Sequence, residues 1–298
     1  MQEPAAHLEN ARPSRHVIED ALSDGSVGVE LELGGLDVAR CADVVAEVLG
    51  GEVREVGRYE RVVETSLGEL RVELDSTWVK KLGEEVIHGG EGRWREVATD
   101  AIEKVAGRVV PCEVVTPPLS RSSLGAIDEL AHALGRAGGR GTFEALRFGF
   151  GVHFNPELTD IRVDTVLPVM RAFAQLHDEL VEEYHVDPSR RLTGFIDPWP
   201  EALNRLLADE RYRPADVGEL MQDYLRITPT RNHALDMLPL FAHVDEARVR
   251  AAIGDQKLKK RPTFHYRLCN CRIGNEAWRP SQEWSSWLRV EALARELA

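Results

Sequence analysis

Apolar and polar residues alternate in several segments of the chain, and this alternation predicts β-strands with one apolar and one polar face. In residues 27–33, valine and leucine occupy every second position, and Glu30 and Glu32 lie on the opposite face. Similar patterns indicate further strands at 60–65, 69–75, 108–115, 148–155 and 263–268. These segments are far apart in the sequence, so a sheet built from them must join distant parts of the chain.

Between the strands, apolar residues recur every three or four positions, which is the period of an amphipathic helix. This spacing predicts helices at 37–49, near 95–106, from 120 to 134 and from 280 to 298, and several helices between about 160 and 250 with breaks near 197–198 and 228–229. We expect residues 1–22 to form a flexible tail and residues 23–298 to form a single domain, with a helical layer at about 160–250.

The order of these elements leaves two fold classes to consider. Strands separated by helices are typical of a parallel α/β fold, but neither a dinucleotide-binding glycine loop nor a P-loop follows any predicted strand. Several strands are polar on one face and apolar on the other, which is typical of antiparallel sheets. We therefore predict an α+β fold, in which helices pack on one side of a mostly antiparallel sheet.

The composition indicates a soluble, cytoplasmic protein. Lys and Arg number 37 against 50 Asp and Glu, and the formal charge of -13 disfavours a nucleic-acid partner. The N-terminus lacks the apolar stretch of a secretory signal, and no run reaches membrane-spanning length. Four cysteines are too few for a disulfide scaffold, and the pair Cys269 and Cys271 has no second pair to complete a zinc site.

Two carboxylates stand side by side on the polar face of residues 27–33. Glu30 and Glu32 repel each other unless a cation lies between them, and carboxylate oxygens are ligands that suit Mg²⁺ or Mn²⁺. For this pair alone, a solvated strand face is the alternative.

The same asymmetry recurs in two later strands. In residues 70–75 the polar set is Arg71, Glu73 and Asp75. In residues 108–115 Glu113 is the single charge on a mostly apolar face. Such a carboxylate needs a partner, which is either an arginine or a metal ion.

Two glycines and two polar residues share one face of the predicted strand at 148–155. Gly149, Gly151, His153 and Asn155 alternate there with apolar residues of the other face. Glycines weaken a strand interior, so their position beside a histidine indicates that a bulky group approaches the backbone. A nucleotide phosphate or a metal ion would be such a group, and a core histidine beneath a helix is the alternative.

The last strand and the segment before it contribute basic side chains. Thr263, His265 and Arg267 share a face, and the guanidinium fork of Arg267 matches phosphoryl or carboxylate oxygens. The preceding segment contains a dense basic run, formed by Lys257, Lys259, Lys260 and Arg261. This run is either a phosphate-steering loop or an ordinary solvated turn.

Four motifs in this order resemble those of the amidoligase family, a branch of the carboxylate-amine ligase superfamily that contains glutamine synthetase and γ-glutamylcysteine synthetase. The motifs are Gly28-Val-Glu-Leu-Glu32, Glu113-Val-Val-Thr-Pro-Pro-Leu119, Gly151-Val-His-Phe-Asn155 and the strand that ends in Arg267. The resemblance covers about residues 26–296. It implies a glutamine synthetase-like fold, with a curved antiparallel sheet whose concave face binds ATP and several Mg²⁺ ions.

The resemblance also implies roles for individual side chains. Glu32 and Glu113 would hold the ion near the acyl phosphate, and Glu30 and His153 would hold the ion that bridges the ATP phosphates. Arg267 would neutralise charge on the transferring phosphoryl group.

Three further residues lie in segments that resemble the family. Asn155 closes the third motif and is a candidate for nucleotide binding. Asp75, in Leu74-Asp75-Ser76-Thr77, resembles the family's Asp-Gly-Ser segment and is a candidate catalytic residue. Arg231 lies in the segment before the last strand and is a candidate for substrate or nucleotide binding, with an arginine on a helix surface as the alternative.

The chain departs from the family at one metal-ligand position. Where the family usually has Glu two residues before the arginine of the last strand, this chain has His265. An imidazole can ligate a divalent ion, but it carries no negative charge and is a poorer partner for Mg²⁺ than a carboxylate. This substitution predicts either a shift of metal preference toward Mn²⁺ or weaker catalysis.

Residues and resemblance together predict an ATP- and Mg²⁺-dependent carboxylate-amine ligase that acts on a small-molecule or peptide carboxylate and an amine. The carboxylate would attack the γ-phosphate of ATP, and the amine would displace phosphate from the acyl phosphate. Two alternatives stand beside it: a catalytically weakened nucleotide- or peptide-binding module, and a metal-dependent hydrolase or phosphotransferase. Trp78 and Trp199 are candidates for the substrate pocket, with burial in the core as the alternative.

Overall fold

The fold is built on an antiparallel sheet of eight strands. The computed structural model describes residues 25–74, 111–142, 149–188, 190, 196–254 and 258–298. Within these residues the strand order is β2-β3-β4-β5-β1-β6-β8-β7, and neighbouring strands pair antiparallel. The strands are β1 (Val27–Leu33), β2 (Glu52–Gly57), β3 (Glu60–Thr65), β4 (Gly68–Leu74), β5 (Cys112–Val115), β6 (Val152–Pro156), β7 (Leu235–Asp236) and β8 (His265–Tyr266).

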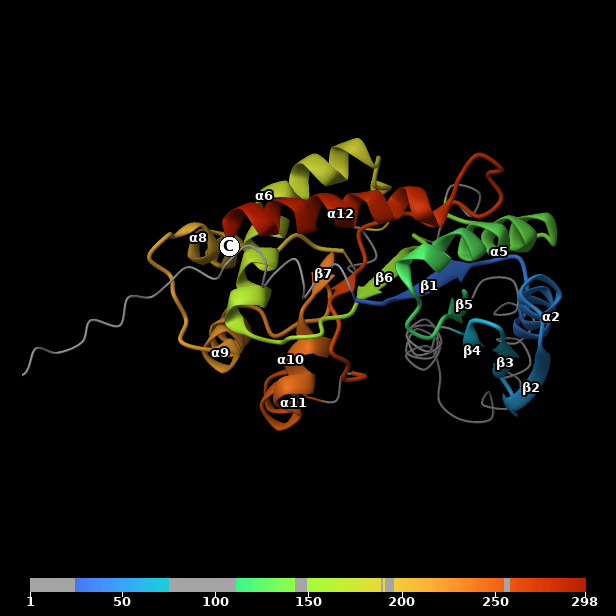
Figure 1. The fold of residues 1–298 in the computed structure, drawn as a ribbon, viewed down its shortest axis with the longest axis horizontal. Helices are drawn as coiled ribbons and strands as arrows, with labels where there is room; N and C mark the ends of the chain where they lie inside the picture. Colours follow the sequence, from blue (N-terminus) through green and yellow to red (C-terminus); the bar gives the residue numbers. More distant parts are fainter. Residues whose placement is uncertain (1–24, 75–110, 143–148, 189, 191–195, 255–257) are drawn as a thin grey trace, which may run out of the picture.

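Helices pack beside the sheet, and α5 and α12 run along one side of it (Figure 1). The helices of the described residues are α2 (Val38–Leu49), α5 (Leu124–Arg136), α6 (Val163–Glu183), α8 (Glu201–Ala208), α9 (Val217–Ile227), α10 (Leu238–Val244), α11 (Glu246–Ile253) and α12 (Pro280–Leu297). None of them combines the length and apolar character needed to cross a membrane. The predicted mixture of helices and an antiparallel sheet is therefore confirmed.

The apolar face of β1 enters the main hydrophobic core. Leu31 and Leu33 are fully buried and belong to the same apolar cluster as Ile127 and Leu130 of α5. Because side chains alternate across a strand, Glu30 and Glu32 project from the other face of the sheet. The core thus fixes which way the two carboxylates point.

A buried carboxylate fixes the start of α12. The Asp128 oxygens of α5 accept hydrogen bonds from the backbone nitrogen of Ser281 at 2.9 Å and from its hydroxyl at 2.6 Å. An acceptor at this position satisfies a first-turn N–H group of the helix. Farther along, Arg121 donates two hydrogen bonds to the buried Glu291, at 2.9 and 2.7 Å. These contacts hold α12 against the segment around α5.

The structure corrects several predicted boundaries. The exposed strand β2 was not predicted, because its six residues show no buried side to create a pattern. The strand β7 lies inside the predicted helical layer. The strands β6 and β8 are shorter than the predicted 148–155 and 263–268, although Gly151 and Thr263 form isolated bridges beside them.

Some predictions fall on residues outside the described part of the chain. These are the tail at 1–22, the helix near 95–106, the start of the strand at 108–115, and the residues Asp75, Trp78 and Lys257. Trp199 is described, and of its two predicted positions it takes the alternative, burial in the core. It is 4% exposed within the core, and its indole Nε1 donates to the Leu235 carbonyl at 3.0 Å.

Candidate metal centre

Strand pairing brings the predicted ligands together on the polar face of the sheet. Glu30 of β1 lies opposite His153 of β6, and Glu32 of β1 lies opposite Glu113 of β5. Glu113 also lies opposite Glu73 of β4, so Glu73, Glu113 and Glu32 form a row across three adjacent strands. Like charges directly opposite one another destabilise a sheet, and bound cations remove that repulsion.

The first ligand group consists of Glu30, His153 and His265, and all three residues are buried. The Glu30 Oε2 atom lies 3.2 Å from His153 Nδ1 and 3.7 Å from His265 Nε2. The two imidazole rings are perpendicular, with centroids 5.4 Å apart. One ligand atom from each residue lies within 4.8 Å of the others, so the group could hold one metal ion.

The second ligand group consists of Glu32, Glu113 and His153, with the same spacing limit of 4.8 Å. The Glu32 Oε1 atom lies 3.5 Å from His153 Nε2. The other oxygen of Glu32 accepts a hydrogen bond from the Gly151 backbone nitrogen at 2.6 Å, which orients the carboxylate. His153 therefore belongs to both ligand groups, with Nδ1 toward Glu30 and Nε2 toward Glu32.

Both histidines are arranged as metal ligands usually are. His153 and His265 each have Nδ1 within 3.2 Å of a carboxylate, from Glu30 and Asp236 respectively. Their Nε2 atoms are buried without a hydrogen-bond partner in the described part of the chain. A carboxylate on one ring nitrogen fixes the tautomer that leaves the other nitrogen free to coordinate. Because an unsatisfied buried polar atom is costly, a metal ion fits these residues well.

Electrostatics keep these ligands in the protonation states that bind metal. Burial lowers the pKa of the His153 imidazole, which favours its neutral form. Burial raises the pKa of Glu30, but contacts with His153 and His265 and the charge of Arg261 outweigh this effect and hold the pKa well below its ordinary value. At neutral pH the site thus contains a charged carboxylate beside a neutral imidazole.

The lowered pKa of His153 gives a pH-dependent prediction. We expect Mn²⁺ affinity to stay level as the pH falls from about 8 to about 6.5, the ordinary histidine pKa, and to weaken below that value as the imidazole becomes protonated. Titration of free Mn²⁺ by electron paramagnetic resonance at each pH measures this affinity. A decline that is already complete at pH 7 would contradict a lowered pKa.

Asp236 is a buried residue of the site that the sequence did not single out. It is fully buried, and its Oδ2 atom contacts His265 Nδ1 at 3.2 Å and Arg231 Nε at 3.0 Å. Burial raises the pKa of Asp236, but the charge of Arg231 and the contacts with His265 hold it well below its ordinary value. The only sequence feature that pointed to Asp236 was the segment 231–236, which is similar to a segment of the family. Arg231 itself lies in the loop before β7, so the alternative of a helix-surface arginine is wrong.

Arg190 explains the glycines that precede β6. Its guanidinium donates hydrogen bonds to the Arg267 and Leu268 carbonyls at 2.7 and 2.6 Å. A Cβ atom at Gly149 would lie 2.6 Å from Arg190 Cγ, and one at Gly151 would lie 2.3 Å from Arg190 Nη2. The bulky group beside these glycines is therefore an arginine of the chain itself, where the sequence indicated a phosphate or a metal ion. Arg190 has no local pattern that predicts this contact.

The remaining predicted residues lie around the two ligand groups. Asn155 is buried, and its amide donates to Glu30 Oε1 at 2.9 Å, so it positions this carboxylate. Arg267 is 9% exposed, donates to the Arg231 carbonyl at 2.8 Å, and has a pKa lowered by burial. Cys269 and Cys271 are buried and belong to neither of the two ligand groups of the described residues.

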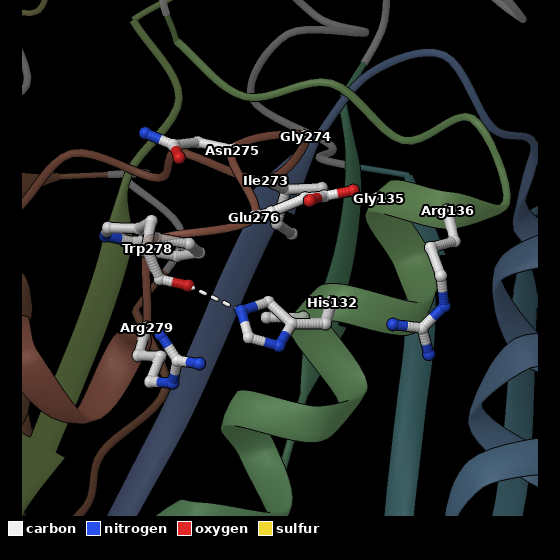
Figure 2. A pocket seen from close by; sticks show the side chains of 10 residues that line it. His132, Gly135, Arg136, Ile273, Gly274, Asn275, Glu276, Trp278 and Arg279 are labelled. Atoms are coloured by element: carbon white, nitrogen blue, oxygen red, sulfur yellow. Dashed lines mark hydrogen bonds between the residues drawn. The ribbon is translucent and has the colours of Figure 1, made fainter.

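A separate hollow lies between α5 and the segment 273–279, on the helical side of the sheet (Figure 2). Its volume is about 390 Å³, and His132 projects into it with Nε2 2.8 Å from the Trp278 carbonyl. None of its lining residues belongs to a ligand group. The hollow is thus distinct from the carboxylate and imidazole cluster.

The fold and the site define a class of protein: an α+β protein whose antiparallel sheet gathers glutamates and histidines on its polar face. The family model described as "Putative amidoligase enzyme" matches residues 24–289. The chain therefore belongs to this amidoligase family, as the four motifs predicted. Neither a curated protein nor a solved structure matches the chain.

Proposed function

We propose that this protein is an ATP-dependent carboxylate-amine ligase with two divalent ions on the polar face of its sheet. Family membership supports the ligase class. The observation that carries the proposal is that His153 lies between two ligand groups. Its Nε2 faces Glu32, which forms one group with Glu113, and its Nδ1 contacts Glu30, which forms the other group with His265. Two adjacent ions suit phosphoryl transfer, because they neutralise the oxygens of both the attacking and the leaving group.

The proposed reaction has two steps. A substrate carboxylate oxygen attacks the γ-phosphorus of ATP, which forms an acyl phosphate and releases ADP. An amine nitrogen then attacks the acyl carbon, loses a proton, and expels inorganic phosphate to leave an amide. Neither step needs a nucleophilic side chain from the protein, so its role is to position and to neutralise charge.

Each side chain has a definite task in this proposal. The carboxylates and His153 and His265 hold the ions, while Asp236 fixes the ring of His265. Arg267, which is buried directly after β8 and whose charge acts on His153, contributes a fixed positive charge for the transferring phosphoryl group. When bound, the ions supply Lewis-acid activation of phosphate oxygens.

The proposal is tested by incubating the protein with ATP, Mg²⁺ or Mn²⁺, and mixtures of carboxylates and amines. We expect phosphate release that depends on both acceptors, and a product whose mass equals their sum less one water. Glu32→Ala should reduce turnover at least about 100-fold, because it removes a ligand that supports transition-state charge. Glu64→Ala is the matched control, since Glu64 lies on β3 opposite Glu69 of β4 and belongs to neither ligand group. Equal turnover in the two variants would refute the site.

A binding module without efficient catalysis is the second candidate function, and His265 favours it. This residue stands where the family usually has a carboxylate, so the first ligand group contains one negative charge, from Glu30. Calorimetry that shows ATP binding without product across a broad acceptor panel would support this candidate. Phosphate release without a heavier product would instead indicate a hydrolase or phosphotransferase.

A further inference from the structure

The segment 258–262, here called the basic strap, crosses the polar face of the sheet and forms ion pairs with it. Arg261 Nη1 lies 2.9 Å from Glu30 Oε1, and Lys259 Nζ lies 3.7 Å from Glu73 Oε1. Glu30 is on β1 and Glu73 is on β4, and β5 lies between these strands in the sheet. The strap thus places one cation on Glu30, a metal-ligand candidate, and one on Glu73, which neighbours Glu113 across β4 and β5.

Backbone contacts fix the path of the strap. The Arg261 nitrogen donates to the Pro239 carbonyl at 3.2 Å, and the Pro262 carbonyl accepts from the Leu158 nitrogen at 2.8 Å. Lys260 points elsewhere, with Nζ 2.9 Å from Glu246 Oε2 on α11. Successive side chains of the strap therefore point in alternate directions. Lys259 and Arg261 reach carboxylates of the sheet, whereas Lys260 reaches Glu246 on α11.

Arg261 and a metal ion are competitors for the same carboxylate. Glu30 belongs to the first ligand group, yet one of its oxygens already accepts from Arg261 and from Asn155 at 2.9 Å each. A divalent ion bound by this carboxylate weakens the attraction between Glu30 and the guanidinium, because the ion neutralises the same negative charge. Arg261 then requires another anion.

The charge balance of the face indicates which anion this is. Divalent ions added to Glu30, Glu32 and Glu113, with the strap cations still present, leave a surplus of positive charge. A phosphate chain has the several negative charges needed to balance it, whereas a single carboxylate has one. The Arg261 Nε atom is also buried without a hydrogen-bond partner in the described residues, so it remains available as a donor.

We infer that Lys259 and Arg261 are exchangeable counter-cations. Arg261 pairs with the ligand Glu30, and Lys259 pairs with Glu73 beside the ligand Glu113. Divalent ions displace both cations, which then bind the phosphates of the nucleotide. This inference rests on the proposed function and deepens it. It makes metal and nucleotide binding mutually dependent, because each ligand removes the charge that opposes the other.

The inference is tested by measuring Mn²⁺ affinity by electron paramagnetic resonance, with and without ATP, in the wild type and in Arg261→Ala. Without ATP, the variant should bind Mn²⁺ about 5-fold tighter, because the competing cation is gone. The increase in Mn²⁺ affinity that ATP produces should fall about 10-fold, because a phosphate ligand is gone. Lys260→Ala, on the same strap, should match the wild type in both measurements.

Unchanged or weaker Mn²⁺ binding by Arg261→Ala without ATP would overturn the inference. Arg261→Lys keeps the charge and provides a second variant, which should bind Mn²⁺ with an affinity between those of the wild type and Arg261→Ala. Thermal melting of each variant identifies loss of folding. If the wild type binds neither Mn²⁺ nor ATP, the proposed function itself fails; if it binds both and the variants behave like it, the strap inference alone fails.

Discussion

Replacing His153 by alanine is expected to abolish binding of both divalent ions and to reduce ligase turnover at least about 100-fold. His153 is the one residue that the two ligand groups share, with Nδ1 3.2 Å from Glu30 and Nε2 3.5 Å from Glu32. Removing its ring therefore takes a ligand from one ion and the orienting contact from the carboxylate of the other. Equilibrium dialysis with Mn²⁺ followed by metal analysis measures the loss as a change in stoichiometry.

His243→Ala is the matched control for this experiment. His243 is an exposed residue in the last turn of α10 and belongs to neither ligand group. It should retain the stoichiometry and turnover of the wild type. If His153→Ala still bound two ions with wild-type affinity, the shared-histidine site would be wrong.

The second large effect is expected from adding one methyl group at Gly151. In Gly151→Ala the new Cβ atom would lie 2.3 Å from Arg190 Nη2 and 2.7 Å from His153 Nε2. Neither group has room to move, since Arg190 is held by backbone carbonyls and His153 is 3% exposed. Overpacking of this kind costs about 1–3 kcal/mol. We expect this loss in free energy of unfolding, measured by urea denaturation, and at least a 10-fold loss in Mn²⁺ affinity.

Gly28→Ala separates this specific clash from the general effect of replacing glycine in a strand. Gly28 lies in β1, and a Cβ atom there would make an ordinary contact of 3.5 Å with Asn155 Cβ. This variant should keep nearly the stability and Mn²⁺ affinity of the wild type. Equal losses in both glycine variants would show that the general cost of replacing a strand glycine causes the loss of affinity. Displacement of His153 would then not be its cause.

The two-residue period of the strands was sufficient to predict which side chains share a face. It placed Glu30 and Glu32 opposite an apolar set, and it separated Glu113 from the buried Cys112 and Val114, as the structure has them. This succeeds because alternation is a local property of an extended chain and needs no knowledge of its neighbours. The motif order then added the family, which the match over residues 24–289 confirms.

Short or exposed strands were beyond the reach of the same argument. The strand β7 has two residues, Leu235 and Asp236, and both are buried, so no alternation marks it. The strand β2 is exposed on both faces and has no apolar side. Both strands lie at an edge of the sheet, where β3 pairs with β2 and β8 pairs with β7. They form through backbone hydrogen bonds, which need no alternation of side chains.

The sequence by itself determined the α+β class, the polar strand faces and the membership of Glu30, Glu32, Glu113 and His153 in one constellation. Only the tertiary structure decided their immediate partners. Arg261 reaches Glu30 across 231 positions of the chain. Arg190 holds the backbone after β8 from a segment with no pattern of its own, and Asp236 orients His265 from a strand of two residues. Their contacts depend on how distant segments pack, and charge or hydrogen-bond complementarity between such segments leaves no periodic trace in the sequence.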